Sequence, residues 1–203
     1  MEEKYELTDQ VAMVVFVAYK DANGEYVWNE ERGPEFYRGS ITYPTLLIPP
    51  KKNYDERSMD TVVHRIRALR DIPEIGVKAG DLGGFIEDEG NLSHYGTCWV
   101  HDNAVVYDNG HVQEDAQVRG SAVIEGGYIH RNAEVSEKAL VTYGADIGWD
   151  AKIYGSAVVY RGSVYSATIH GDACVISPFN QDTFSDRDVA TGNWIHNQLI
   201  DES

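Results

Sequence analysis

Histidine is the side chain best suited to exchange a proton or bind a metal near neutral pH, and this 203-residue sequence contains seven. Two of them occupy the same position of a repeat that runs through the chain. We expect that position to form one outward column, made of His101, Arg119, Ser136, Tyr154 and His170. Such a column could bind a small anionic ligand or an acidic part of a partner protein, and the alternative is an ordinary solvated surface.

Three further histidines, His94, His111 and His130, are expected on another surface, but at unlike positions of the repeat. A three-histidine metal site would therefore need side chains from more than one subunit. We predict no metal site and no cofactor, and we assign no residue a catalytic role. The sequence contains no phosphate-binding loop and no Cys-x-x-Cys pair. Its two cysteines, Cys98 and Cys174, are expected too far apart to form a disulfide.

A three-residue pattern, small then any then aliphatic, must position these side chains. Sixteen such triplets fill residues 84–175, and most successive aliphatic residues are six apart. Because neighbouring side chains of a strand point to opposite faces, the small and aliphatic residues face inward and the middle residue outward. Gly, Asp, Asn and Ser follow many triplets and favour tight corners. The spacing predicts a short strand and a corner every six residues, and so about five triangular coils stacked through parallel ladders.

This repeat resembles that of the hexapeptide-repeat proteins, which form left-handed parallel β-helices. The segments VHRIRALRD at 63–71, GVKAGDLGG at 76–84 and NLSHYGTCWV at 91–100 are also similar to those of YdcK-like proteins, a family of gut bacteria and phages often labelled as transferases. The resemblance implies a left-handed coil, a homotrimer around a three-fold axis, and a transferase site between subunits. Transferases of this class carry long loops that hold substrate around a histidine, whereas this repeat exceeds its six-residue step by at most two residues.

One side of the expected prism is apolar. Grouping every third triplet gives three outward columns, of which two are polar or mixed. The apolar column consists of Phe85, Val105, Val123, Leu140, Val158 and Cys174. A continuous apolar stripe should not face water. Either the same stripe of other subunits covers it, with Phe85, Val105, Val123, Leu140 and Val158 as the homotrimer interface, or the N-terminal region of the chain does.

We expect three parts in the chain. The first, 1–83, is an N-terminal β cap with an inserted hairpin and a polar linker at 51–60. The second, 84–176, is the β-helix. The third, 177–203, is a C-terminal cap, because the open end of a β-helix must be protected from edge-to-edge aggregation.

Within the two caps some elements can be predicted. The segments 11–19 and 25–28 are interpreted as the two strands of the hairpin, and 62–69 as a further strand. The segment 193–200 is interpreted as a short helix.

The chain is acidic, with 33 Asp and Glu against 17 Lys and Arg and a formal net charge of −16. This charge argues against binding of nucleic acid and against docking on an anionic membrane. The acidic start and the lack of an apolar run of about 20 residues indicate neither a secretory signal nor a spanning helix. Together with only two cysteines, these features predict a cytoplasmic protein.

Three functions remain open from the sequence. The leading hypothesis is a non-enzymatic binding or scaffold protein, a trimeric β-helix that presents an N-terminal module. The second is an acyl or nucleotide-dependent transferase of the hexapeptide class. The third, suggested by the phage members of the similar family, is an inhibitor that binds a host defence protein or sequesters a nucleotide signal.

Overall fold

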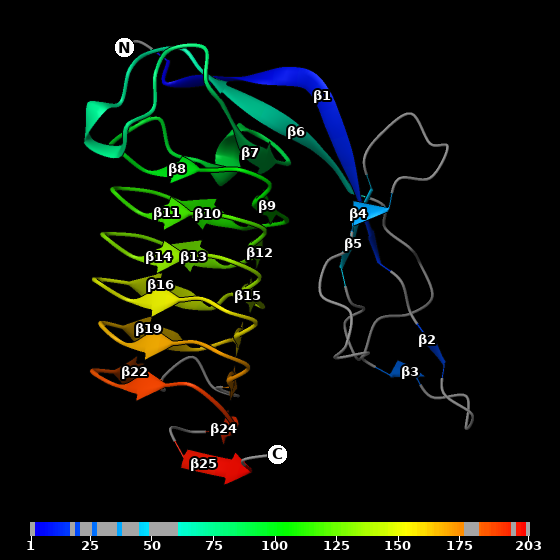
Figure 1. The fold of residues 1–203 in the computed structure, drawn as a ribbon, viewed down its shortest axis with the longest axis vertical. Coiled ribbons are helices and arrows are strands. Elements are labelled where there is room, and N and C mark those ends of the chain that lie inside the picture. Colours follow the sequence, from blue (N-terminus) through cyan, green and yellow to red (C-terminus); the bar gives the residue numbers. More distant parts are fainter. Residues whose placement is uncertain are drawn as a thin grey trace.

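The computed structural model describes residues 3–16, 19–20, 26–27, 36–37, 45–48, 61–176, 183–195 and 198–201. Within them the regular structure is mainly β, wound as a column of stacked coils that β1 (Tyr5–Phe16) and β6 (Thr61–Ala68) extend at one end (Figure 1). Two short 3-10 helices, Pro73–Ile75 and Glu89–Asn91, are the only helical elements of these residues. No helix in this part of the chain is long and apolar enough to cross a membrane. The expected mainly β, parallel β-helix fold is confirmed.

Three parallel sheets form the sides of the coil. The first contains β9 (Val105–Tyr107), β12 (Val123–Glu125), β15 (Leu140–Thr142), β18 (Val158–Tyr160), β21 (Cys174–Ile176) and β24 (Asn193–Ile195). The second contains β10 (His111–Val112), β13 (Tyr128–Ile129), β16 (Asp146–Gly148), β19 (Ser163–Tyr165) and β22 (Thr183–Ser185). The third contains β8 (Trp99–Val100), β11 (Gln117–Val118), β14 (Glu134–Val135), β17 (Lys152–Ile153), β20 (Thr168–Ile169) and β23 (Asp188–Val189).

The register between coils is the one that the triplets predict. In the first sheet Val123 pairs with Leu140 of the next coil. In the second, Asp146 pairs with Tyr128 on one side and Ser163 on the other, although five-residue steps lie nearby in the chain. A shift of one residue would turn each inward side chain out to solvent, so burial of the aliphatic residues fixes this register.

The coil is longer than expected, with about six turns instead of five. Residues 183–195 add β22, β23 and β24 to the second, third and first sheets. The aliphatic pattern misses this coil because Phe184 and Trp194 stand at two of its inward positions; Phe184 is buried and Trp194 packs against the core. The helix expected at 193–200 is wrong, since β25 (Gln198–Asp201) pairs antiparallel with β24. An added strand protects the edge of the last coil through backbone hydrogen bonds.

Aliphatic side chains stack on one another along the inside of the coil. Ile124, Val141 and Val159 come from three successive coils of the first sheet, and all three are fully buried. The small residue of each triplet fits where no larger one would. A Cβ atom at Gly127, for example, would lie 2.7 Å from Cγ1 of Val141. Alternation of small and aliphatic residues therefore sets the close packing of the interior.

Acidic residues at the corners join one coil to the next. Asp102 and Glu114 have positive φ angles of 52° and 58°. The Oδ2 atom of Asp102 accepts a hydrogen bond from the backbone N–H of Gly120 at 3.0 Å, and Oε2 of Glu114 accepts one from Arg131 at 2.8 Å. Part of the acidic charge of the chain thus belongs to the structure of the corners, where the carboxylates satisfy backbone donors of the following coil.

The first sheet continues beyond the coil into the N-terminal part of the chain. There β7 (Leu82–Ile86) pairs parallel with β9, β6 (Thr61–Ala68) antiparallel with β7, and β1 (Tyr5–Phe16) antiparallel with β6. Two further strands follow, with β5 (Thr45–Ile48) parallel to β1 and β4 (Phe36–Tyr37) antiparallel to β5. Figure 1 shows β1 and β6 leaving one end of the coil and bending toward β4 and β5 beside it. The strand expected at 62–69 is confirmed as β6.

The predicted N-terminal hairpin is confirmed only at its tip. There β2 (Tyr19–Lys20) pairs antiparallel with β3 (Tyr26–Val27). The residues from 11 to 16 belong instead to β1, where 11–14 pair with β6 and 13–16 pair with β5, because these long-range partners offer them a ladder into the first sheet. The linker expected at 51–60 lies outside the described residues.

Ile153 and Lys152 provide a matched test of the inside–outside alternation. Ile153 is fully buried, whereas Lys152 beside it in β17 is exposed. Ile153→Ala leaves a cavity and should lower the free energy of unfolding by about 2–5 kcal/mol. Lys152→Ala should change it by less than about 0.5 kcal/mol. Denaturant unfolding followed by circular dichroism measures both values, and equal losses would contradict the alternation.

Candidate functional site

The upper part of the predicted polar column is a small hydrogen-bonded group. The Nε2 atom of His101 lies 2.8 Å from Oε1 of Gln117, and Nη2 of Arg119 donates to the same oxygen at 3.4 Å. Arg119 also forms an ion pair with Glu134, at 3.6 Å from Nε to Oε1. Burial lowers the pKa of His101 below its usual value of 6.5, and the hydrogen bond to Gln117 opposes this shift only in part. This group therefore holds a neutral imidazole beside a guanidinium whose charge is partly balanced.

The lower part of the same column is a separate pair. The rings of Tyr154 and His170 are stacked, with centroids 4.9 Å apart. The Nε2 atom of His170 lies 2.9 Å from Oδ1 of Asp188 in the next coil. Ser136 stands between the two groups in sequence and is half-buried like its neighbours in the column. All five residues share one side of the coil, as expected, but they form two groups and no single pocket, so their role in ligand binding stays a prediction.

The apolar column is covered at one end by the chain itself. Phe85, Val105 and Val123 are buried in one cluster with Ala12 of β1 and Val63 of β6. The guanidinium of Arg65 lies 4.4 Å from the ring centre of Phe85. The N-terminal strands thus provide the intramolecular cover that was one of the two alternatives, over these three residues.

The remaining residues of that column keep part of their surface open. Leu140 packs against the edge of the covered cluster and is half-buried, as are Val158 and Cys174. Of the five residues expected at a subunit interface, Leu140 and Val158 have exposed surface, and the interface itself stays a prediction.

The second sheet carries a cluster that the sequence did not indicate. The Nε2 atom of His130 lies 2.8 Å from Oδ1 of Asp146, and the hydroxyl of Tyr165 donates to Oδ2 of the same carboxylate. These residues come from three successive coils. The side chain of His130 is 15% exposed and that of Asp146 is 35% exposed. Burial and the bond to Asp146 raise the pKa of Tyr165, so its hydroxyl keeps its proton as a donor.

A glycine makes room for this cluster. His130, Gly148 and Tyr165 each follow the aliphatic residue of their triplet, so they form one outward column on neighbouring strands of the second sheet. A Cβ atom at Gly148 would lie 2.4 Å from Nε2 of His130. The missing side chain lets the imidazole lie over the next coil and reach Asp146. A glycine between a histidine and a tyrosine at one phase of the repeat is the signal that could have revealed the site.

The arrangement suits acid–base chemistry. A carboxylate that accepts the N–H of an imidazole fixes the ring tautomer and leaves the other nitrogen as a proton acceptor. Tyr128 lies beside His130 with ring centroids 5.4 Å apart, and His111 stacks on Tyr128 at the same distance. The second sheet therefore presents one carboxylate-bound histidine inside a row of rings.

The three histidines considered for a shared metal site have different surroundings. His94 accepts a hydrogen bond at Nδ1 from the backbone N–H of Lys4 and stacks on Tyr5 in the N-terminal cap. The Nδ1 atom of His111 lies 2.5 Å from the carbonyl oxygen of Gly90. Among the described residues, no three His, Cys, Asp or Glu side chains are grouped so that they could hold a metal ion.

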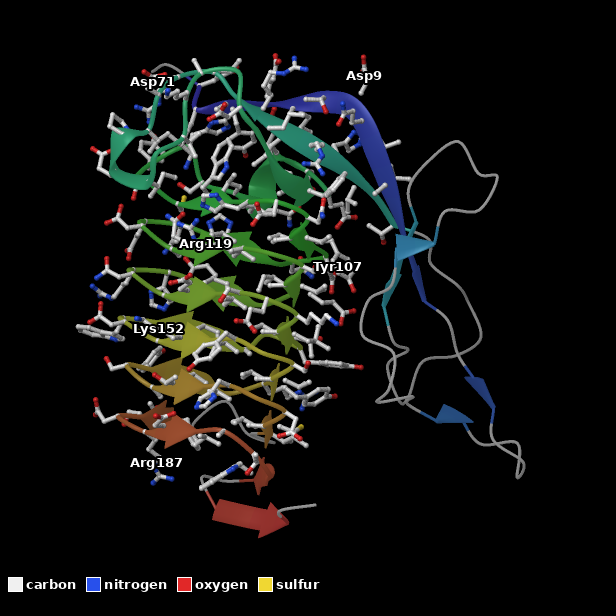
Figure 2. The ribbon with its side chains drawn as sticks, viewed as in Figure 1. Asp9, Asp71, Tyr107, Arg119, Lys152 and Arg187 are labelled. Atoms are coloured by element: carbon white, nitrogen blue, oxygen red, sulfur yellow. The ribbon has the colours of Figure 1, made fainter. Side chains whose placement is uncertain are left out.

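The candidate residues are spread over different sides of the prism. Figure 2 places Arg119 and Lys152 on the opposite side of the coil from Tyr107. Lys152 lies in β17 of the third sheet and Arg119 directly follows β11 of the same sheet, whereas Tyr107 is buried in the cluster of the first sheet next to the N-terminal strands. Any ligand of the third-sheet column and any partner of the apolar column would thus bind to separate surfaces.

The sequence of the chain matches no protein-family model, and no curated protein matches it significantly. The coil, its columns and the His130 cluster therefore carry the functional argument.

The half-buried His101 should make the fold less stable in acid. Its pKa is lowered in the folded chain and is near 6.5 in the unfolded chain. Below that pH the unfolded chain binds a proton that the folded chain does not, so the stability present at higher pH decreases as the pH falls. As the pH is lowered from about 7.5 to 5.5, the melting temperature of His101→Gln should therefore fall less than that of the wild type. Calorimetric scans of both proteins across this range test it, and parallel curves would count against it.

Proposed function

We propose that the chain is a non-enzymatic binding or scaffold protein of the hexapeptide-repeat, YdcK-like kind, assembled as a cytoplasmic homotrimer that presents its N-terminal strands to a partner. The observation that carries this proposal is the apolar column of the first sheet. Its upper residues are covered by β1 and β6, while Leu140, Val158 and Cys174 continue the same column with exposed surface. A column that is covered at one end and open at the other favours a further contact along the open part.

The border of the open part has the composition of a protein interface. Tyr143 and Tyr160 lie with their ring centroids 4.2 Å apart, and the guanidinium of Arg161 lies 5.7 Å from the centre of each ring. Tyrosine and arginine are enriched in protein–protein interfaces, where apolar residues form the centre and polar groups the rim. Three copies that meet along Leu140 and Val158 would bury the open residues and leave the third-sheet columns available for a ligand.

Ionic substitutions in the open column test the assembly. The double variant Leu140→Glu with Val158→Glu places two carboxylates in the proposed contact and should convert a trimer into a monomer. A matched control, Lys138→Glu with Lys152→Glu, changes two exposed residues outside the column and should leave the trimer intact. Sedimentation equilibrium gives the mass of the particle that the wild type and each double variant form in solution. If the wild type is a monomer, or if the Leu140→Glu, Val158→Glu variant is still a trimer, this contact is ruled out.

A second candidate function is a hexapeptide-type transferase with its site between subunits. The specific observation in its favour is His130, whose Nε2 is 2.8 Å from Asp146 and which lies in a row of rings on the second sheet. An imidazole held by a carboxylate can accept the proton of a nucleophile that attacks an acyl donor.

Acetyl-CoA serves as the probe for this second candidate. A transferase should show a higher melting temperature with acetyl-CoA and a slow release of the free thiol of coenzyme A. His130→Asn should abolish the release and keep the thermal shift. The control His170→Asn removes the other histidine that is paired with an aspartate, on the third sheet. It should change neither the thermal shift nor the release of the thiol. If acetyl-CoA gives no thermal shift, or if both variants lose activity equally, His130 is not the base.

A further inference from the structure

A lysine amine and a cysteine thiol lie together inside the N-terminal cap. The side chain of Lys4 is fully buried, and so is Cys98 in the first coil. The Nζ atom of Lys4 donates a hydrogen bond to the carbonyl oxygen of Cys98 at 2.9 Å and lies 3.2 Å from its Sγ atom. The hydrogen bonds found for Nζ in the described part of the chain go to these two atoms of Cys98 and to no carboxylate.

The surrounding contacts hold the two atoms in place. The backbone N–H of Lys4 donates to Nδ1 of His94 at 3.1 Å, and the hydroxyl of Tyr5 donates to the carbonyl oxygen of Leu92 at 2.6 Å. The ring of Tyr5 stacks on that of His94, with centroids 4.3 Å apart. These contacts fix the start of β1 over the first coil.

The environment favours the uncharged forms of both groups. Burial lowers the pKa of the Lys4 amine and raises the pKa of the Cys98 thiol, against the smaller opposite effect of each on the other. An uncharged amine keeps the lone pair that is needed to form a new bond. Because peroxide reacts with the thiolate and not with the thiol, the raised pKa of Cys98 slows its oxidation in the closed structure.

We infer that Lys4 and Cys98 form an oxidative modification site, in which Nζ and Sγ become covalently joined through one oxygen atom when the protein meets a peroxide. Nitrogen and sulfur already lie within van der Waals contact at 3.2 Å, and a bridge through one atom draws them together less than a direct bond would. The bridge ties the beginning of β1 to the first coil.

The reaction balances with two molecules of peroxide. The S–H bond of Cys98, one N–H bond of Lys4 and the O–O bonds of both peroxide molecules break, and the Sγ–O and O–Nζ bonds form to one peroxide oxygen. Four electrons pass from the amine and thiol to the two peroxide molecules, and three molecules of water leave. Oxidation of the thiol to a sulfenic acid is the first half of this sequence.

Access to the buried thiol requires local opening at the start of β1. Glu3 is exposed and directly precedes Lys4. Local opening costs less free energy than global unfolding, and it would admit a molecule as small as hydrogen peroxide. The bridge should therefore form slowly in the native protein and faster under conditions that open the start of β1.

Peptide mapping after treatment with hydrogen peroxide tests the site directly. The full chain carries Cys174→Ser, so that the half-buried second thiol does not react. Trypsin of the untreated protein should cut after Lys4. After oxidation, the segment 1–20 should stay uncut at Lys4 and appear joined to 79–119, with the mass of one oxygen added and two hydrogens lost. Reducing agent should release both peptides.

Two further measurements decide the outcome. The bridged protein should melt at a higher temperature than the same sample after reduction, because the bridge restricts the unfolded chain. Lys4→Arg keeps a hydrogen-bond donor but lacks the amine, and it should give no joined peptide. Conversion of Cys98 to sulfinic or sulfonic acid with Lys4 still open to trypsin would overturn the proposal. The mapping of the Cys174→Ser protein decides this even if Lys4→Arg fails to fold.

Discussion

The hydrogen-bond ladder between successive coils is the interaction on which the rest of the structure depends. Each short strand bonds to the equivalent strand of the coil above and the coil below, so every position of the repeat recurs as a column. The columns in turn decide which residues pack inside, as Ile124 and Val141 do, and which surface is apolar. A functional group on this scaffold is therefore defined by two coordinates, its side of the prism and its coil.

Much of this fold follows from the triplet pattern because the pattern is local. Small and aliphatic residues two apart fix the inward face, and their repetition fixes the register of columns such as Val105, Val123 and Leu140. The pattern did not predict the last coil because aromatic Phe184 and Trp194 replace aliphatic residues there. The pairing of β1 with β6 was not predicted for another reason. It joins segments far apart in sequence, and several strands could have paired with the same edge of the sheet.

The candidate sites were less predictable because they depend on side-chain reach between coils. Sequence placed His101 and His170 in one column, yet their bonds go to Gln117 and Asp188, which belong to a neighbouring column. His130 was assigned to the correct side, but its bond to Asp146 requires the space above Gly148. Lys4 and Cys98 meet only because the start of β1 folds back over the first coil, and no spacing rule connects residues so far apart.

The direction of the ladders also determines how the molecule would respond to a mechanical load. The hydrogen bonds between coils run along the prism axis, and each coil is held by its two neighbours. Tension applied between the N-terminal strands and β25 would act along those bonds and open the coils one after another, from an end inward. Corner carboxylates such as Asp102 and Glu114 lie across the same seams and would oppose each opening. A load across the prism would instead meet three sheets at once, so the coil is expected to be stiff sideways and to extend stepwise along its length.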